Sequence, residues 1–77
     1  MKPERIRFNF TTEVERVGTH EPFDVIVSAE WWPLDGELGW SLSDLNGEPV
    51  DDDELTQHSF KMLADQVATE AMERDNG

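Results

Sequence analysis

Residues 23–40 read FDVIVSAEWWPLDGELGW, and this stretch decides the fold. Apolar residues recur at every second position over residues 23–32, which is the pattern of a half-buried β-strand. The four residues 33–36 form a turn sequence, because Asp-Gly supplies the backbone freedom that a tight reversal needs. A short strand over about residues 38–45 follows. The stretch therefore predicts a β-hairpin, and the first strand has an apolar face made of Phe23, Val25, Val27, Ala29 and Trp31.

The N-terminal residues show the same alternation. One face of residues 4–15 carries Ile6, Phe8, Phe10, Thr12 and Val14. The intervening positions are charged or polar, so this pattern predicts another half-buried strand. Gly18 and Pro22 then mark a turn that leads into the hairpin. Three consecutive strands joined by turns predict an antiparallel meander.

An acidic run at residues 51–54 marks the start of a helix. The Asp51-x-x-Glu54 spacing suits a capping box, and carboxylates are favourable at a helix N-terminus. The residues that follow carry apolar side chains at helical spacing, namely Phe60, Leu63, Ala64, Val67, Ala68 and Ala71. We therefore predict a helix over about residues 52–74 with one buried face. Asn46-Gly47 is a hairpin-type turn, but Pro49 cannot donate to a strand ladder, so we interpret this segment as a connection.

These elements predict one α+β domain over residues 1–77, a three-stranded antiparallel β-meander with one C-terminal α-helix packed on one face. A chain of this length buries only about 60% of its unfolded surface, so the core is thin. The strand order leaves both outer strands with an unpaired edge. Such edges invite dimerisation or the addition of a strand from a partner, so a homodimer is one expected state.

Charge is the strongest compositional signal. The chain has 18 Asp and Glu against 6 Lys and Arg, a formal net charge of −12. This charge repels nucleic-acid phosphates and anionic lipids and attracts basic partners, so we expect a basic protein as partner and neither direct nucleic-acid nor membrane binding. The sequence has no cysteine, no signal-peptide pattern and no apolar run long enough to cross a bilayer. We therefore expect a cytoplasmic protein.

The adjacent Trp31 and Trp32 raise a question, because neighbouring side chains on a strand point to opposite faces. Trp31 is expected in the core, and Trp32 on the other face beside Ile26. One interpretation is that an arginine of the first strand, at position 5 or 7, shields Trp32 by a cation–π contact worth about 0.5–1 kcal/mol. The other is that Trp32 and Ile26 belong to an interaction surface, since Trp is enriched at binding hot spots. The sequence leaves both open.

The predicted topology gathers acidic residues at one end, where the first turn meets the connection to the helix. The candidate acidic partner-binding residues are Glu15, Glu21, Glu48, Asp51, Asp52, Asp53 and Glu54. One interpretation is helix capping and solubility. The other is mimicry, in which carboxylates imitate a row of phosphates and occupy the basic channel of a nucleic-acid-binding protein.

Catalytic and metal-binding patterns are missing from the sequence. An EF-hand alignment from Asp44 places Pro49 where the loop needs Gly and Leu55 where it needs a bidentate Glu. His20 and His58 lie in no zinc-binding spacing, and we interpret them as solvated. There is no phosphate-binding loop and no recognisable nucleophile with its base. We therefore expect no enzyme, no catalytic residue, no cofactor and no metal ion.

Two segments carry a resemblance to a known group of proteins: EPFDVIV at residues 21–27 and LNGEPVDDDELTQHSFKMLADQVATEA at residues 45–71. Over about residues 21–72 the chain resembles small acidic bacteriophage-encoded proteins of uncharacterised function, in which a β-hairpin leads through an acidic cap into a terminal helix. Its Trp-rich centre departs from that pattern. The resemblance implies a phage-type protein in the host cytoplasm that inhibits host machinery such as CRISPR or restriction enzymes, and no site residue transfers with it.

Two hypotheses follow. The first is a non-enzymatic accessory or inhibitor protein that binds a basic host protein surface, as an acidic nucleic-acid mimic of the anti-CRISPR or anti-restriction class. The second is a structural or assembly module that self-associates through its open sheet face or its edges and whose acidity serves only solubility. Under the second hypothesis, a Trp32→Ala change is expected to abolish self-association.

Overall fold

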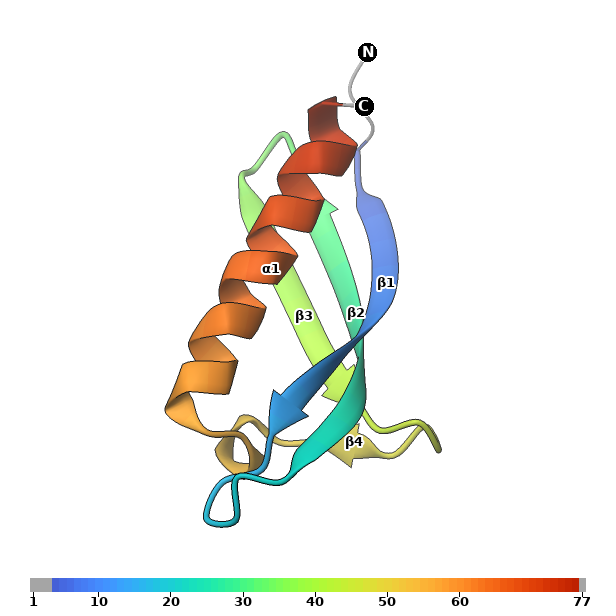
Figure 1. Cartoon of the computed structure of the whole chain (residues 1–77). Coiled ribbons are helices and arrows are strands. Elements are labelled where there is room, and N and C mark those ends of the chain that lie inside the picture. Colours follow the sequence, from blue (N-terminus) through green and yellow to red (C-terminus); the bar gives the residue numbers. More distant parts are fainter. Residues whose placement is uncertain (1–3, 77) are drawn as a thin grey trace.

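The structure, a computed structural model, describes residues 4–76. Its elements in chain order are β1 (Ile6–Glu15), β2 (Pro22–Trp32), β3 (Glu37–Ser43), β4 (Pro49–Val50), the 3₁₀ turn η1 (Asp52–Glu54) and α1 (Gln57–Asn76). The strands form one antiparallel sheet in the order β1-β2-β3-β4, and α1 packs against β1 and β3 on one face (Figure 1). The predicted α+β class, with a C-terminal helix on an antiparallel sheet, is confirmed.

The prediction of three strands is wrong, because residues 49–50 form a fourth. An Asx turn starts this hairpin: the Asp44 side chain accepts hydrogen bonds from the N–H groups of Asn46 and Glu48, each at 2.9 Å. Pro49 then lies opposite Ser43 on the outer edge of the sheet. An edge position tolerates proline, since an N–H that faces away from the ladder is not needed there.

Two strands are shorter than predicted. The strand expected over residues 4–15 begins at Ile6, since its pairing with β2 begins with Ile6 opposite Trp31. The strand expected over residues 38–45 ends at Ser43, because Asp44 opens the Asx turn.

The inner face of the sheet combines the apolar faces expected from the alternation. Phe8 of β1 lies opposite Ala29 of β2, which lies opposite Trp40 of β3. Because α1 covers this face, one core forms among the described residues. Its buried members are Phe8, Val14, Val25, Val27, Ala29, Leu42, Leu55, Leu63, Val67 and Ala71.

The helix begins later than predicted, at Gln57 instead of residue 52. The capping spacing is used, since the Asp51 N–H donates to the Glu54 carboxylate at 2.9 Å, but it caps the short turn η1. Leu55 then becomes extended and buried, which separates η1 from α1. Along α1, Ala68 is exposed although the pattern placed it on the buried stripe. Within residues 4–76, no helix has an apolar span that could cross a membrane.

The segment after η1 lies along the outer edge of β1 at its C-terminal end. The Val17 N–H donates to the Glu54 carbonyl at 2.8 Å, and the Thr56 N–H donates to the Glu15 carbonyl at 3.1 Å. Arg16 and Leu55 form the antiparallel bridge between these bonds. This bridge fixes the first turn against η1.

Candidate functional site

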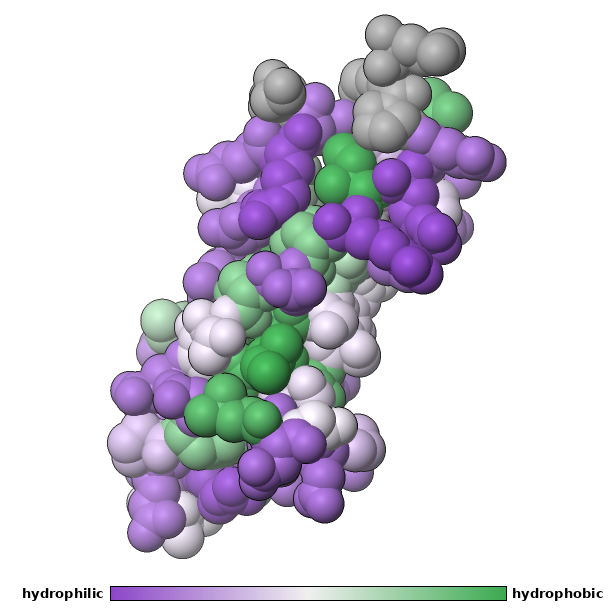
Figure 2. Space-filling view, turned by 90° about the vertical axis from the view of Figure 1, so that its right-hand side faces the viewer, coloured by the Kyte–Doolittle hydropathy of each residue, from purple (hydrophilic) through white to green (hydrophobic). Residues whose placement is uncertain are grey.

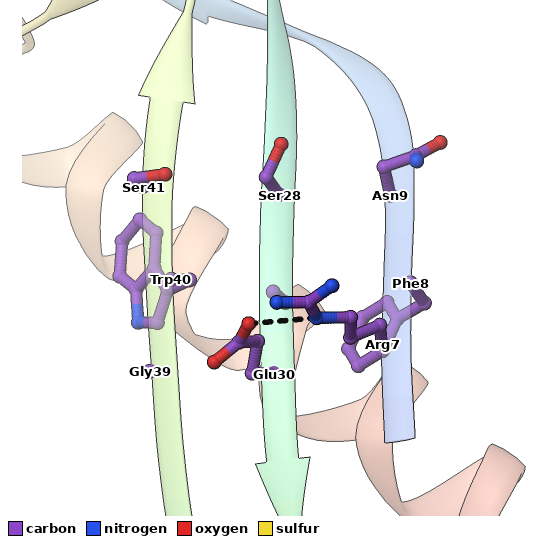
Figure 3. Close-up of a pocket in the computed structure, with 9 residues that line it drawn as sticks. Arg7, Phe8, Asn9, Ser28, Glu30, Gly39, Trp40 and Ser41 are labelled. Carbon is purple, nitrogen blue, oxygen red and sulfur yellow. Dashed lines mark hydrogen bonds and ion pairs between the residues drawn. The ribbon is translucent and has the colours of Figure 1, made fainter. Parts of the chain in front are cut away.

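The face of the sheet that α1 leaves uncovered carries a hollow of about 520 Å³. Small polar side chains form a row across three strands, because Asn9 lies opposite Ser28 and Ser28 lies opposite Ser41 (Figure 3). The neighbouring row ends at Gly39, which has no side chain. These short side chains leave the hollow open, and it is a shallow depression on a sheet surface.

An ion pair stands beside this row. Arg7 Nε donates to Glu30 Oε1 at 2.9 Å (Figure 3). Arg5 Nη1 lies 3.9 Å from the same oxygen. The Arg7 side chain is 66% exposed, so water screens the pair. Exposed pairs of this kind contribute at most about 1 kcal/mol. Glu30 therefore holds two arginines near the uncovered face without a strong gain in stability.

Trp32 lies on the uncovered face and is half-buried. Its Cζ3 atom lies 4.0 Å from the position that a Cβ would take at Gly39 on the adjacent strand. The indole ring thus covers the one residue of β3 that has no side chain of its own, an arrangement known to stabilise glycine in sheets. Trp31 is on the inner face, packed against the core, and its Nε1 has no hydrogen-bond partner among the described residues.

The first interpretation of Trp32, a cation–π contact with Arg5 or Arg7, is wrong. Arg5 and Arg7 both turn to the Glu30 carboxylate, which offers a full opposite charge within reach. In the part of the chain that the structure describes, guanidinium groups stack instead on other rings: Arg16 lies 4.3 Å from the Phe23 centroid. Arg74 of α1 lies 4.5 Å from the Phe8 centroid.

Ile26, the other apolar candidate, is half-buried and lies opposite Thr11 and Ser43. Ser28 and Glu30 separate it from Trp32 along the same face of β2. The two residues therefore do not form one apolar patch. They stand on opposite sides of the row of small polar residues, and whether either contacts a partner stays a prediction.

The acidic candidate residues lie at one end of the molecule. The β1–β2 turn, the β3–β4 turn and η1 all lie at the lower end of Figure 1, opposite the C-terminal end of α1. We call this region the acidic end, and its carboxylates are Glu15, Glu21, Glu48, Asp51, Asp52, Asp53 and Glu54. The turns that carry these residues therefore lie at one end, as the order of the strands predicts, and whether the residues bind a partner stays a prediction.

Two of these carboxylates lie beside a basic side chain. Glu54 Oε1 lies 3.6 Å from Arg16 Nη1, and Glu15 Oε2 lies 3.1 Å from His20 Nδ1. The other five form no ion pair with a described residue. All five belong to exposed residues: Glu21, Glu48, Asp51, Asp52 and Asp53. The acidic end therefore presents uncompensated charge to solvent.

The two histidines lie at exposed positions, His20 in the first turn and His58 in the first turn of α1. His20 has φ 59°, a left-handed conformation, and its N–H bonds to the Arg16 carbonyl at 2.9 Å. Within residues 4–76 no three His, Cys, Asp or Glu side chains are grouped so that they could hold a metal ion.

The hollow and the row of small polar residues that forms it are not predicted from the sequence. The signal was present, since Asn9, Ser28 and Ser41 all occupy outward positions of their strands. Only the register shows that they form one row, and a shift by two residues would separate them without changing the faces.

No protein-family model, curated protein or solved structure matches this chain.

Proposed function

We propose that this chain is a non-enzymatic accessory or inhibitor protein that binds a basic protein surface with its acidic end. The observation that carries the proposal is the set of five exposed carboxylates without a cationic partner among the described residues, gathered from three separate segments of the chain. A basic surface that docked there would supply the missing counter-charges and lower the repulsion within the cluster.

The backbone beneath these carboxylates is well fixed. The first turn is bonded to η1 through Val17 and Glu54, and η1 carries its own cap at Asp51. Arg16 adds an ion pair to Glu54 and a stacking contact to Phe23. A charge array on an ordered backbone loses less conformational entropy on binding than the same charges on a free loop.

The exposed carboxylates of the acidic end are complementary in charge to a protein surface that binds phosphates. Carboxylates held at fixed positions attract the same Lys and Arg side chains that neutralise a nucleic-acid backbone. We therefore propose a nucleic-acid-binding protein as partner, and mimicry as the mode of binding. Phage origin and inhibition of a host defence enzyme are implied only by the resemblance of residues 21–72 and belong to this proposal.

The test measures binding of a fluorescein-labelled arginine-rich peptide by anisotropy. One variant carries Asp51→Asn, Asp52→Asn and Asp53→Asn. The control carries Asp35→Asn, Glu37→Gln and Glu73→Gln, which are exposed acids outside the acidic end. Each variant changes the formal charge from −12 to −9, since three carboxylates are neutralised. Asn at position 51 keeps a good capping residue.

We expect the first variant to bind the peptide about tenfold more weakly and the control variant to bind within about twofold of the parent chain. The affinity of the parent chain should fall steeply as salt is raised. Equal losses in the two variants would mean that the peptide senses only net charge, and the proposal would then fail.

The alternative function, a self-associating assembly module, is favoured by a separate observation. The outer edge of β1 is unpaired over most of its length, so a second copy could add a strand there.

A further inference from the structure

The outer edge of β1 offers free backbone groups at alternate residues. Glu15 and Val17 bond away from β2, to Ser59, Thr56 and Glu54. In an antiparallel pair the direction of the N–H and C=O groups alternates along the strand, and the register of β1 with β2 is uninterrupted from Ile6 to Glu15. The groups that face outward therefore belong to Arg7, Asn9, Thr11 and Glu13.

These outward groups form no hydrogen bond to any other described part of the chain. The segment at Leu55 covers the edge only at its C-terminal end. Residues 7–13 are therefore the free edge of β1. They contain no proline and no glycine, the residues that usually interrupt strand pairing.

The other side of the sheet is better protected. Its outermost strand, β4, has two residues, and one of them is proline. The part of β3 that β4 leaves unpaired, residues 37–41, contains Gly39 and a single charge, at Glu37. Short edges with proline resist strand addition. The free edge of β1 is therefore the better candidate for pairing.

An apolar stripe accompanies the free edge. Figure 2 views the side of the molecule on which β1 lies in Figure 1, and green atoms run along it between the charged regions. Ile6 and Phe10 of β1 are only half-buried, and Met62 of α1 is 60% exposed beside a small groove that Thr12 and Glu13 also line. A strand added to β1 would cover this stripe.

We propose that two copies of this chain pair their β1 strands antiparallel, about a two-fold axis at Phe10. In this register the free edges of the two copies face each other over residues 7–13. Arg7 of one copy lies opposite Glu13 of the other, and Asn9 lies opposite Thr11. All four residues have outward backbone groups, so each pair exchanges both of its N–H···O=C bonds. The result is one continuous antiparallel sheet.

Charge favours this register. Glu13 lies opposite Asp24 of β2, two carboxylates at directly paired positions, and neither forms an ion pair with a described residue. Like charges placed so are destabilising. The second copy brings Arg7 beside Glu13 at both ends of the paired segment. The two acidic ends lie at opposite ends of the dimer, which limits the repulsion between two chains of charge −12.

The inner face is also complementary. In this register Phe10 meets Phe10 of the second copy across the axis, and Phe8 lies opposite Thr12. The two-fold axis is perpendicular to the sheet, so both copies of α1 lie on the same face. The exposed Met62 and the half-buried Ile6 would then be covered by the partner.

The first experiment is sedimentation equilibrium of the whole chain over a range of concentrations, with Thr11→Pro and Thr11→Val as a matched pair. The Thr11 N–H points away from β2, so proline at this position removes no bond of the monomer and blocks the edge. We expect the parent chain and Thr11→Val to dimerise and Thr11→Pro to remain a folded monomer by circular dichroism. Trp32→Ala, which would disrupt an interface on the uncovered face, should leave the dimer intact.

Amide hydrogen exchange by NMR gives a residue-level readout. The N–H groups of Asn9 and Thr11 should exchange fast in dilute solution and slowly at concentrations where the dimer forms, whereas those of Phe8 and Phe10 stay protected throughout. A parent chain that remains monomeric at all concentrations overturns the proposal. Dimerisation of Thr11→Pro also overturns it.

The second experiment tests the register by exchanging charges. Glu13→Arg places an arginine opposite Asp24, so the monomer should not lose stability, yet the dimer should weaken about tenfold because Arg7 then faces a second arginine in both symmetric contacts. The double variant Arg7→Glu and Glu13→Arg should recover dimer affinity to within about threefold of the parent. Glu30→Gln is the control for the contact that Arg7 makes within its own chain. Failure of the double variant to recover would refute this register.

The inference is independent of the proposed function. The acidic end lies outside the free edge, so the variant with Asp51, Asp52 and Asp53 neutralised should dimerise as the parent does. Loss of peptide binding with retained dimerisation, or the reverse, separates the two proposals.

Discussion

The ring of Trp32 lies over Gly39 of the neighbouring strand, with its Cζ3 atom 4.0 Å from the position of a Cβ at that glycine. This is an ordinary van der Waals separation, so the glycine is not required for space. The relationship answers why two tryptophans stand side by side: Trp31 packs against the core, and Trp32 shields a weak point of β3 on the other face.

We expect Gly39→Ala to raise the free energy of unfolding by about 0.5 kcal/mol, because alanine loses less backbone entropy on folding than glycine. Gly47, with φ +89°, is the contrast, since nothing lies within 4 Å of the position of its Cβ but its backbone is left-handed. Gly47→Ala should cost about 1 kcal/mol. Urea titrations of the two variants measure both values, and a loss at Gly39 would show that Trp32 needs a closer approach.

Ser59 is buried at 7% exposure and connects α1 to the edge of β1. Its Oγ accepts a hydrogen bond from the Glu15 N–H at 2.9 Å. Ser59→Ala would leave that N–H without a partner in a region shielded from water, so we expect a loss of about 1–2 kcal/mol in unfolding free energy. Thermal unfolding gives the loss, and faster exchange of the Glu15 amide would locate it. A Ser59→Thr variant keeps the hydroxyl and should lose less of the amide protection.

Arg16 makes two contacts at once, an ion pair with Glu54 and a stacking contact with the Phe23 ring. We expect Arg16→Ala to lower the unfolding free energy by about 1 kcal/mol, the sum of two partly exposed contacts. Arg16→Lys should keep the ion pair with Glu54 but lose the stacking on Phe23. As a control for the loss of an exposed ion pair alone, Glu30→Gln should change stability by less than about 0.5 kcal/mol. Urea denaturation distinguishes these cases, and equal effects would mean that the stacking contributes nothing.

Ala68 and Ala71 both belong to the apolar stripe expected from the sequence, but only Ala71 is buried, at 2% exposure. Ala68→Lys should therefore alter stability by no more than about 0.5 kcal/mol. Ala71→Lys would place a charge in the core and should lower stability by about 3 kcal/mol or more, enough to unfold much of a small domain. Thermal unfolding of both variants, followed by circular dichroism, measures the two losses. A loss only for Ala71→Lys supports the burial seen in the structure, and equal losses support the stripe predicted from the sequence.

Alternation alone was sufficient to assign the faces of β1, β2 and β3, because burial on one face is a property of each strand by itself. The same reasoning placed the acidic residues together, since an antiparallel meander brings alternate turns to the same end. These inferences needed only local pattern and the direction of the chain.

Local pattern failed where a second segment decides the conformation. Pro49 is part of a strand because it pairs with Ser43 at the edge of the sheet. Leu55 is extended, and not helical as the sequence predicted, because it pairs with Arg16. Trp32 contacts Gly39 and not an arginine, because Arg5 and Arg7 both lie within ion-pair distance of Glu30. Each outcome depends on a register that no single segment encodes, and the row Asn9, Ser28 and Ser41 is hidden for the same reason.

The bridge between Arg16 and Leu55 shapes the whole sheet. Only residues 51–54 join Val50 on the last strand to Leu55 on the outer side of the first, and η1 shortens their reach. A flat sheet of four strands would hold those two edges about 14 Å apart, with the bridge further out still. The sheet must therefore curl at this end, so that β4 and the outer edge of β1 come close enough for residues 51–54 to connect them. No such connection joins the edges at the other end of the sheet, where Trp31 Nε1 is buried without a hydrogen-bond partner among residues 4–76, so we expect local opening to begin there.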